Sequence, residues 1–170
     1  MATSGPIRTA SISDHDPRRV FTSLYQEHRD SALQLLYRLT GSWSAAEDAL
    51  HQAFATLYAR QADVDLTKSP RNLLITVSVN FARREYRDGK RMPPPERSRP
   101  GPSPRAARVE ELIQSLSSDE RAIVVLHYYE RFTYPEIAEL LTIPVGTVKW
   151  KMHEALARIR SAMEKLADEM

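Results

Sequence analysis

The sequence predicts an all-α protein built from two small helical domains, the second of which contains a helix-turn-helix. Apolar residues recur with the 3.6-residue period of helices in several segments, and the alternation typical of strands does not occur. A stretch rich in proline and arginine divides these segments into two groups and indicates a linker. We therefore expect a disordered tail at residues 1–17, a first domain at 18–88, a flexible linker at 89–108 and a second domain at 109–167.

The composition is that of a folded soluble protein. Of the 170 residues, 42% are hydrophobic and 27% are charged. The net charge is only +2 but the pI is near 9.0, a mild basic excess that favours a polyanion such as nucleic acid as partner. The absence of cysteine excludes disulfides, thiol nucleophiles and cysteine-ligated metals. The sequence has no long apolar run and no secretory signal, so we expect a cytoplasmic protein without membrane insertion.

The first domain is expected to begin with two amphipathic helices. The first runs from Phe21 to Leu39 and ends at Gly41. We expect Ser44 to cap the second helix, because Glu47 three residues later completes a capping-box pattern. That helix, from about Ala45 to Arg60, is predicted to bury Ala46, Ala49, Leu50, Ala53, Phe54 and Leu57.

A third helix is expected from Pro70 to Asp88. Ser69 is a suitable cap, and proline is favoured at the first helical position. This helix is apolar on two sides, which indicates a central place in a bundle or contact with a partner. One face carries Leu73, Leu74, Val77 and Phe81, and the other carries Ile75, Val79 and Tyr86.

The second domain is expected to start with a helix at Val109. Two further capping boxes follow, Ser117 with Glu120 and Thr133 with Glu136. A helix of about eight residues, a short turn at Pro144 and a longer helix then give the layout of a helix-turn-helix. The long helix is predicted to bury one stripe, made of Val148, Met152, Ala155, Ile159 and Met163.

Trp150 lies almost opposite this stripe, because successive helical residues are about 100° apart. The same outward face offers groups that suit base edges in the major groove: Lys149 as a donor to guanine, His153 as donor or acceptor, and Glu154 as an acceptor from cytosine. Lys151, Arg158 and Arg160 are better placed for phosphates. The alternative is an ordinary helical hairpin with solvated charges. The predicted DNA-binding residues of this helix are Thr147, Lys149, Trp150, Lys151, His153, Glu154 and Arg158.

The sequence gives no support to an enzyme. None of the 5 histidines falls in HExxH or another metal-binding spacing. Glu47 and His51 lie one turn apart, which is more often a surface pair than a site. No glycine-rich phosphate loop occurs, and we expect neither metal nor cofactor.

Segments of both domains resemble one family. The run "YPEIAELLTIPVGTVK" is similar to the promoter-reading domain of extracytoplasmic-function (ECF) sigma factors of bacterial RNA polymerase. The segments "RLTG" followed by "AED", and "LLITVSVN", resemble the first domain of the same family, in the same order. The resemblance covers about residues 20 to 165. It implies a dissociable polymerase subunit whose first domain docks on the core enzyme and opens the minus-10 element, while its second reads the minus-35 element.

The resemblance also implies site residues in the first domain. On the outer face of the second helix, Asp48, His51, Gln52 and Ala55 stand where the family contacts core polymerase. The loop 61–69 occupies the place where the family captures a flipped minus-10 base. On the third helix the implied DNA-binding residues are Asn80, Arg83, Arg84 and Arg87, and Tyr86 is suited either to stacking on a base or to packing.

Several positions depart from the family pattern, and they leave rival hypotheses. His51 and Gln52 replace a glutamine and an acidic residue, and Arg84 replaces an aspartate, so the expected docking face loses acidic charge. The first hypothesis is a working ECF sigma factor that binds core polymerase and promoter DNA and has an anti-sigma partner. The second is a sigma-like protein that binds an anti-sigma factor without activating polymerase. The third is a DNA-binding regulator that does not need polymerase.

Overall fold

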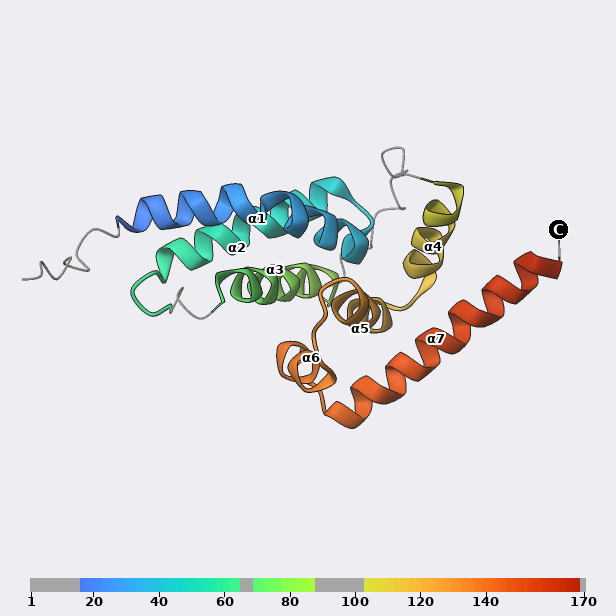
Figure 1. Cartoon of the computed structure of the whole chain (residues 1–170). Coiled ribbons are helices and arrows are strands. Elements are labelled where there is room, and N and C mark those ends of the chain that lie inside the picture. The colour runs from blue at the N-terminus through green and yellow to red at the C-terminus, as the bar shows by residue number, and fades with distance from the viewer. Residues whose placement is uncertain (1–15, 65–68, 88–102, 169–170) are drawn as a thin grey trace, which may run out of the picture.

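The computed structural model describes residues 16–64, 69–87 and 103–168. Within these ranges the chain forms helices and no strands, as predicted. Figure 1 shows the order of the helices along the chain. They are α1 (Pro17–Thr40), α2 (Trp43–Ala59), α3 (Pro70–Arg87), α4 (Pro104–Ser115), α5 (Ser118–Tyr128), α6 (Tyr134–Leu141) and α7 (Val145–Asp168).

The turn between α1 and α2 confirms one prediction and corrects another. Gly41 ends α1 with a left-handed φ of 69°, and its N–H donates to the Tyr37 carbonyl over 2.7 Å. The expected cap at Ser44 is wrong, because Ser42 already stands in the extended conformation and accepts from the Ala45 N–H over 3.3 Å. Helix α2 therefore begins at Trp43, whose ring stacks on Tyr37 with the centroids 4.3 Å apart.

Two helices begin earlier than predicted, and for the same reason. Asp16 caps α1 and Ser103 caps α4, and each is followed directly by a proline that suits the first helical position. The predicted end of the tail, at residue 17, is therefore one residue too late, because Pro17 belongs to α1. The expected linker ends too late as well, since its residues 104–108 belong to α4. Most of its remaining residues lie outside the described ranges.

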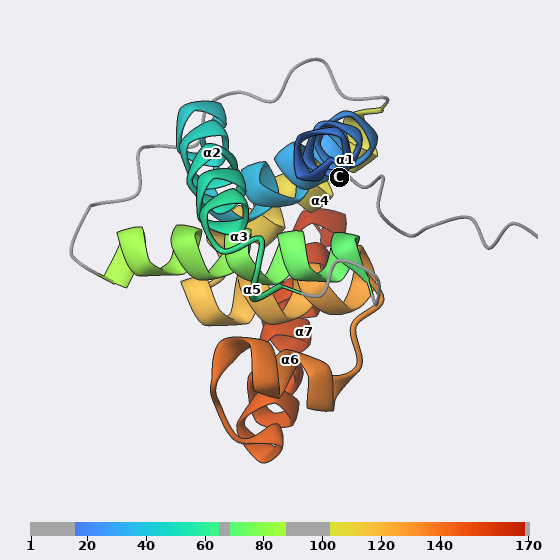
Figure 2. The same ribbon diagram turned by 90° about the vertical axis from the view of Figure 1, so that its left-hand side faces the viewer.

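Helix α3 begins at Pro70, as predicted, and lies at the centre of the molecule. It packs against α1 and α2, which lie on one side of it in the second view (Figure 2), and it also contacts α6. The buried residues of this helix are Leu74, Ile75, Ser78, Val79 and Ala82, whereas Leu73, Val77 and Phe81 are only partly buried. The expected apolar character on two sides is explained by this central position.

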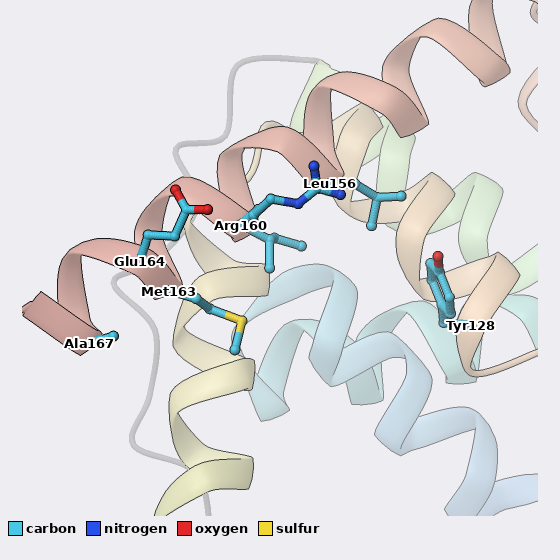
Figure 3. A pocket seen from close by; sticks show the side chains of 7 residues that line it. Tyr128, Leu156, Arg160, Met163, Glu164 and Ala167 are labelled. Carbon is cyan, nitrogen blue, oxygen red and sulfur yellow. The ribbon is translucent and has the colours of Figure 1, made fainter.

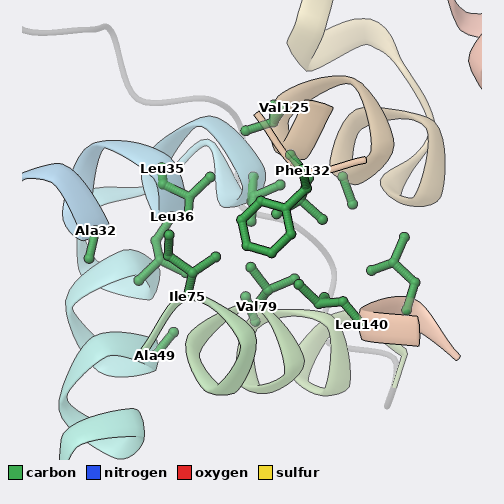
Figure 4. Close-up of a cluster of buried hydrophobic side chains, with 14 of the residues drawn as sticks. Ala32, Leu35, Leu36, Ala49, Ile75, Val79, Val125, Phe132 and Leu140 are labelled. Carbon is green, nitrogen blue, oxygen red and sulfur yellow. The ribbon is translucent and has the colours of Figure 1, made fainter. Parts of the chain in front are cut away.

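The first half of the chain, α1 to α3, and the second half, α4 to α7, share one apolar core. Figure 4 shows Leu36 of α1, Val79 of α3 and Leu140 of α6 facing the ring of Phe132, which follows α5. Phe132 is 7% exposed, and Leu36 and Val79 are fully buried. Burial of this kind stabilises a fold in proportion to the apolar area removed from water. The two predicted domains are therefore packed together, not held apart.

Both predicted capping boxes of the second half are present. Ser117 accepts from the Glu120 N–H while the Glu120 carboxylate accepts from the Ser117 N–H, and Thr133 and Glu136 form the same reciprocal pair. These caps fix the starts of α5 and α6. Helix α5 packs on the first half of α7.

Helix α7 buries less than the sequence predicts. Val148, Met152 and Ala155 are buried, Ile159 is partly buried, and Met163 is 47% exposed, so its predicted burial is wrong. The helix outruns the core beyond Ile159, which still packs against it. Figure 3 shows the shallow apolar hollow that results beside Tyr128, Leu156 and Met163.

Candidate nucleic-acid interface

Helices α6 and α7 form the predicted helix-turn-helix. The turn between them contains Thr142 in the left-handed conformation, with φ 56°, which reverses the chain sharply. Val148 and Met152 face the core, at 0% and 2% exposure. Trp150, on the other side of α7, is 61% exposed. The predicted orientation of this helix is therefore confirmed, and its role in DNA binding stays a prediction.

The exposed face of α7 gathers chemically varied groups. Lys149, Trp150 and His153 are exposed and lie within a single turn, while Thr147 and Glu154 are partly buried at its edges. Together they offer a cation, a large apolar ring, an imidazole and a carboxylate. This combination suits base edges and thymine methyl groups in a major groove.

Two basic residues of α7 are already paired with carboxylates. The Lys151 Nζ lies 3.3 Å from Asp119 Oδ2, and Arg158 donates to Glu120 Oε2 over 3.1 Å. Both acids stand in the first turn of α5, where negative charge is favourable beside the helix N-terminus. Arg158 remains 59% exposed, whereas Lys151 is 24% exposed. A phosphate would have to compete with Glu120 for Arg158 and with Asp119 for Lys151, and Arg158 is the more accessible of the two cations.

The predicted DNA-binding residues of α3 separate into two groups. Asn80 and Arg84 are exposed, and the Arg84 guanidinium lies 5.8 Å from the centre of the Phe81 ring. Arg83 is 16% exposed, donates to the Leu141 carbonyl over 3.1 Å and to Asp119 Oδ1 over 3.0 Å. Arg83 is therefore covered by the end of α6, and its role in DNA binding stays a prediction. The side chains of Tyr86 and Arg87 lie outside the described part of the structure.

Asp119 therefore joins α3, α5 and α7. Partial burial acts to raise the pKa of its carboxyl, but the hydrogen bonds and positive charges of Arg83 and Lys151 outweigh this effect and hold the pKa below its ordinary value. The carboxylate is ionised at neutral pH. We call Arg83, Asp119 and Lys151 the Asp119 cluster.

The predicted polymerase-binding residues lie on the outer face of α2. Asp48, His51, Gln52 and Ala55 are all exposed, and His51 and Gln52 each lie three or four residues from Asp48 and Ala55, so the four share one side of the helix. Residues 65–68 of the loop expected to capture a base lie outside the described ranges.

Several contacts across the two halves were not predicted. Arg121 is 4% exposed and donates to the Leu39 carbonyl over 2.9 Å, and Gln114 donates to the Arg38 carbonyl over 2.9 Å. Arg71 of α3 pairs with Glu130. One signal in the sequence pointed to Arg121: a basic residue beside the apolar run "AIVVL".

Within the described residues, no cluster of histidine or acidic side chains is arranged to hold a metal ion. No helix of this part of the chain is long and apolar enough to cross a membrane.

Comparisons with known proteins agree on one family. Residues 24–92 match the family described as Sigma-70 region 2, and residues 106–159 match the family described as Sigma-70, region 4. The chain is 25% identical to the ECF RNA polymerase sigma factor SigW of Bacillus subtilis, over 94% of this chain and 96% of that protein. It is 27% identical to the ECF RNA polymerase sigma factor SigL of Mycobacterium tuberculosis, over 85% of this chain and 89% of that protein.

The fold recurs in a solved structure. The sigma factor RpoE of Bartonella quintana, in complex with the anti-sigma factor NepR, has a TM-score of 0.69 at 18% identity, over 86% of this chain and 98% of that one. The two family regions occur in the expected order, and the relatives align over nearly their whole length. This chain therefore belongs to the sigma-70 family of bacterial RNA polymerase sigma factors, in the extracytoplasmic-function class.

Proposed function

We propose that this chain directs core RNA polymerase to promoters by presenting three separate surfaces. The observation that carries the proposal is the exposed face of α7, because the fold leaves Lys149, Trp150 and His153 free of the core while it buries the opposite side of the helix. These residues would read the minus-35 element. Thr147 and Glu154 would flank the contact, and Lys151 and Arg158 would hold phosphates.

The other two surfaces belong to the first domain, which begins with α1 and includes α2 and α3. Asn80 and Arg84 of α3, together with Arg83 and Arg87, would hold the minus-10 strand. The outer face of α2, with Asp48, His51, Gln52 and Ala55, would dock on core polymerase. Phosphodiester synthesis is then catalysed by the core enzyme, and this chain supplies no catalytic group. Since the polymerase works on the chromosome, the cytoplasm is the place of action.

An anti-sigma factor is the second expected partner. The sigma factor RpoE was solved with the anti-sigma factor NepR. The structure of CnrH is also similar, with a TM-score of 0.65 and 21% identity over 87% of this chain and 90% of that one. CnrH was solved in complex with the cytosolic domain of CnrY. The rival proposal is a sigma-like protein that binds such a partner without activating polymerase. One observation favours it: His51 and Gln52, which are exposed on the docking face, carry no acidic charge.

The deciding experiment measures association with core polymerase and run-off transcription from candidate promoters in the same samples. We expect binding and initiation with the natural chain. Asp48→Lys should abolish both, because it reverses the acidic charge among the four proposed docking residues. Glu27→Lys, which makes the same change at an exposed position of α1, is the matched control and should retain both. A folded chain that does not bind core polymerase would refute this proposal. Binding to duplex DNA alone would then separate a DNA-binding regulator from the rival.

A further inference from the structure

We infer that the packed arrangement of the two halves is a self-inhibited state, in which Asp119 withholds one DNA-binding cation of each half from phosphate. The inference rests on the proposed function, since it takes Arg83 and Lys151 to be DNA contacts. It adds a specific residue that opposes promoter binding. It also predicts that DNA competes with a contact inside the protein.

The geometry of the Asp119 cluster supports this competition. Asp119 Oδ1 accepts from Arg83 of α3 over 3.0 Å, and Asp119 Oδ2 lies 3.3 Å from Lys151 of α7. One carboxylate thus engages a cation from the proposed minus-10 helix and another from the proposed minus-35 helix. Phosphate oxygens are acceptors of the same kind, so a cation held by Asp119 is unavailable to DNA.

Because Arg83 is largely buried, DNA can compete for it only after the protein changes conformation. Arg83 is 16% exposed, and its guanidinium also donates to the carbonyl of Leu141 at the end of α6. The positive charge is favourable there, because helix C-termini carry partial negative charge. The phosphate backbone of a duplex cannot reach Arg83 while α6 lies over α3. Binding through Arg83 therefore requires the two halves to separate.

A second group of contacts holds the halves together at positions outside the proposed DNA surfaces. Arg71 pairs with Glu130, Gln114 donates to the Arg38 carbonyl, and the Arg38 guanidinium lies 4.2 Å from the centre of the Tyr129 ring. Polar contacts of this kind are common in interfaces between domains that move relative to one another. They give a way to open the molecule without changing any DNA-binding residue.

The expected effect follows from a two-state equilibrium. If only the separated state binds DNA fully, the apparent dissociation constant equals the intrinsic one divided by the separated fraction. Asp119→Asn keeps the shape of the side chain but removes its charge. It should weaken the packed state and release Arg83 and Lys151 together.

The first measurement is the distance between the halves. The chain has no cysteine, so spin labels can be placed at Ser44→Cys on α2 and Ser161→Cys on α7, both exposed in the structure. We expect a single short-distance population in the parent, and a longer population in Asp119→Asn and in Glu130→Gln. Glu139→Gln, at an exposed position of α6, removes the same charge and should leave the parent distribution unchanged.

The second measurement is the affinity for a random-sequence DNA duplex, which reports mainly phosphate contacts. We expect Asp119→Asn and Glu130→Gln to bind about fivefold more tightly than the parent or better, and Glu139→Gln to bind within about twofold of it. An unchanged distance distribution in both test variants would overturn the inference. An equal gain of affinity in Glu139→Gln would do so too, because the effect would then be one of net charge.

Two controls separate this inference from the proposed function. Thermal melting followed by circular dichroism identifies a variant that fails to fold, and Glu130→Gln then carries the test if Asp119→Asn does not fold. Core binding and run-off transcription are measured in the same variants. Separation and tighter DNA binding without core binding would refute the proposed function alone, whereas full transcription with an unchanged distance distribution would refute self-inhibition alone.

Discussion

At the scale of single residues, Trp150 is the large apolar side chain with the greatest exposure in the described part of the protein, at 61%. A tryptophan in water leaves a large apolar area uncovered, and such area often marks a contact surface. Its neighbours Lys149 and His153 are exposed as well. The indole thus lies where it would contact a groove of DNA, and nothing in its packing ties it to the core.

We expect Trp150→Ala to weaken DNA binding or to change its sequence preference while the melting temperature stays within a few degrees of the parent. The physical reason is that an exposed side chain contributes little to folding. Binding to promoter duplexes and thermal denaturation are the two measurements. Met152→Ala, two residues away and 2% exposed, is the control, and it should cost about 2–5 kcal/mol of stability. A comparable loss of stability in Trp150→Ala would show that the ring is structural.

Adjacent arginines show what the sequence alone cannot decide. Arg83 and Arg84 are chemically identical neighbours on α3, yet Arg84 is exposed and Arg83 is covered by α6. Helical periodicity separates them by about 100° but does not say which direction meets the second half of the chain. That outcome depends on packing between segments far apart in the sequence.

At the scale of the helices, local signals in the sequence predicted several of the ends correctly. Gly41, Pro70 and the capping boxes at Ser117 and Thr133 all act where expected. The errors have local causes too: Ser42 takes the capping role expected of Ser44, since Gly41 ends the preceding helix and leaves Ser42 extended. The exposed end of α7 could not be predicted, because its apolar period continues past the point where the core ends.

The capping box of α6 yields a prediction that depends on pH. A backbone hydrogen bond from Thr133, followed by one from its hydroxyl, holds the pKa of Glu136 below its ordinary value of 4.5. The sign follows from the lowered folded-state pKa: this contribution to stability is complete above pH 4.5 and is lost as the pH falls through the folded-state pKa.

We expect Thr133→Ala to raise the pKa of Glu136 part of the way towards 4.5, because the hydroxyl hydrogen bond to Glu136 disappears while the backbone N–H of residue 133 still donates. The lost cap should cost about 1 kcal/mol at neutral pH, because no hydroxyl then accepts from the Glu136 N–H. The measurements are a carboxyl-carbon titration by nuclear magnetic resonance and chemical denaturation. Ser23→Ala, at an exposed position of α1, is the control for stability. A pKa of Glu136 that does not move would contradict the assigned cause.

At the scale of the whole molecule, Arg121 holds the two halves together by satisfying backbone carbonyls. It donates to Leu39 of α1 and to Ile113, Gln114 and Leu116 at the end of α4. Helix ends leave such carbonyls without partners inside the helix, and burying them unpaired is costly. A single guanidinium therefore stabilises the junction of three helices.

We expect Arg121→Met to destabilise the protein by about 3 kcal/mol, since methionine fills the space but donates no hydrogen bond. Arg19→Met, at an exposed position near the start of α1, is the matched control and should change stability by less than about 0.5 kcal/mol. Denaturant unfolding measures both. Equal stability of the two variants would show that water replaces the guanidinium without loss.

The covering of α3 by α6 also has a consequence for rates. If the halves must part before polymerase and promoter are fully engaged, productive assembly is a slow isomerisation followed by fast capture. Its observed rate would then rise with polymerase concentration only to a plateau, set by how often the protein opens on its own. Competition among sigma factors for a limited pool of core enzyme would depend on that opening frequency as well as on affinity.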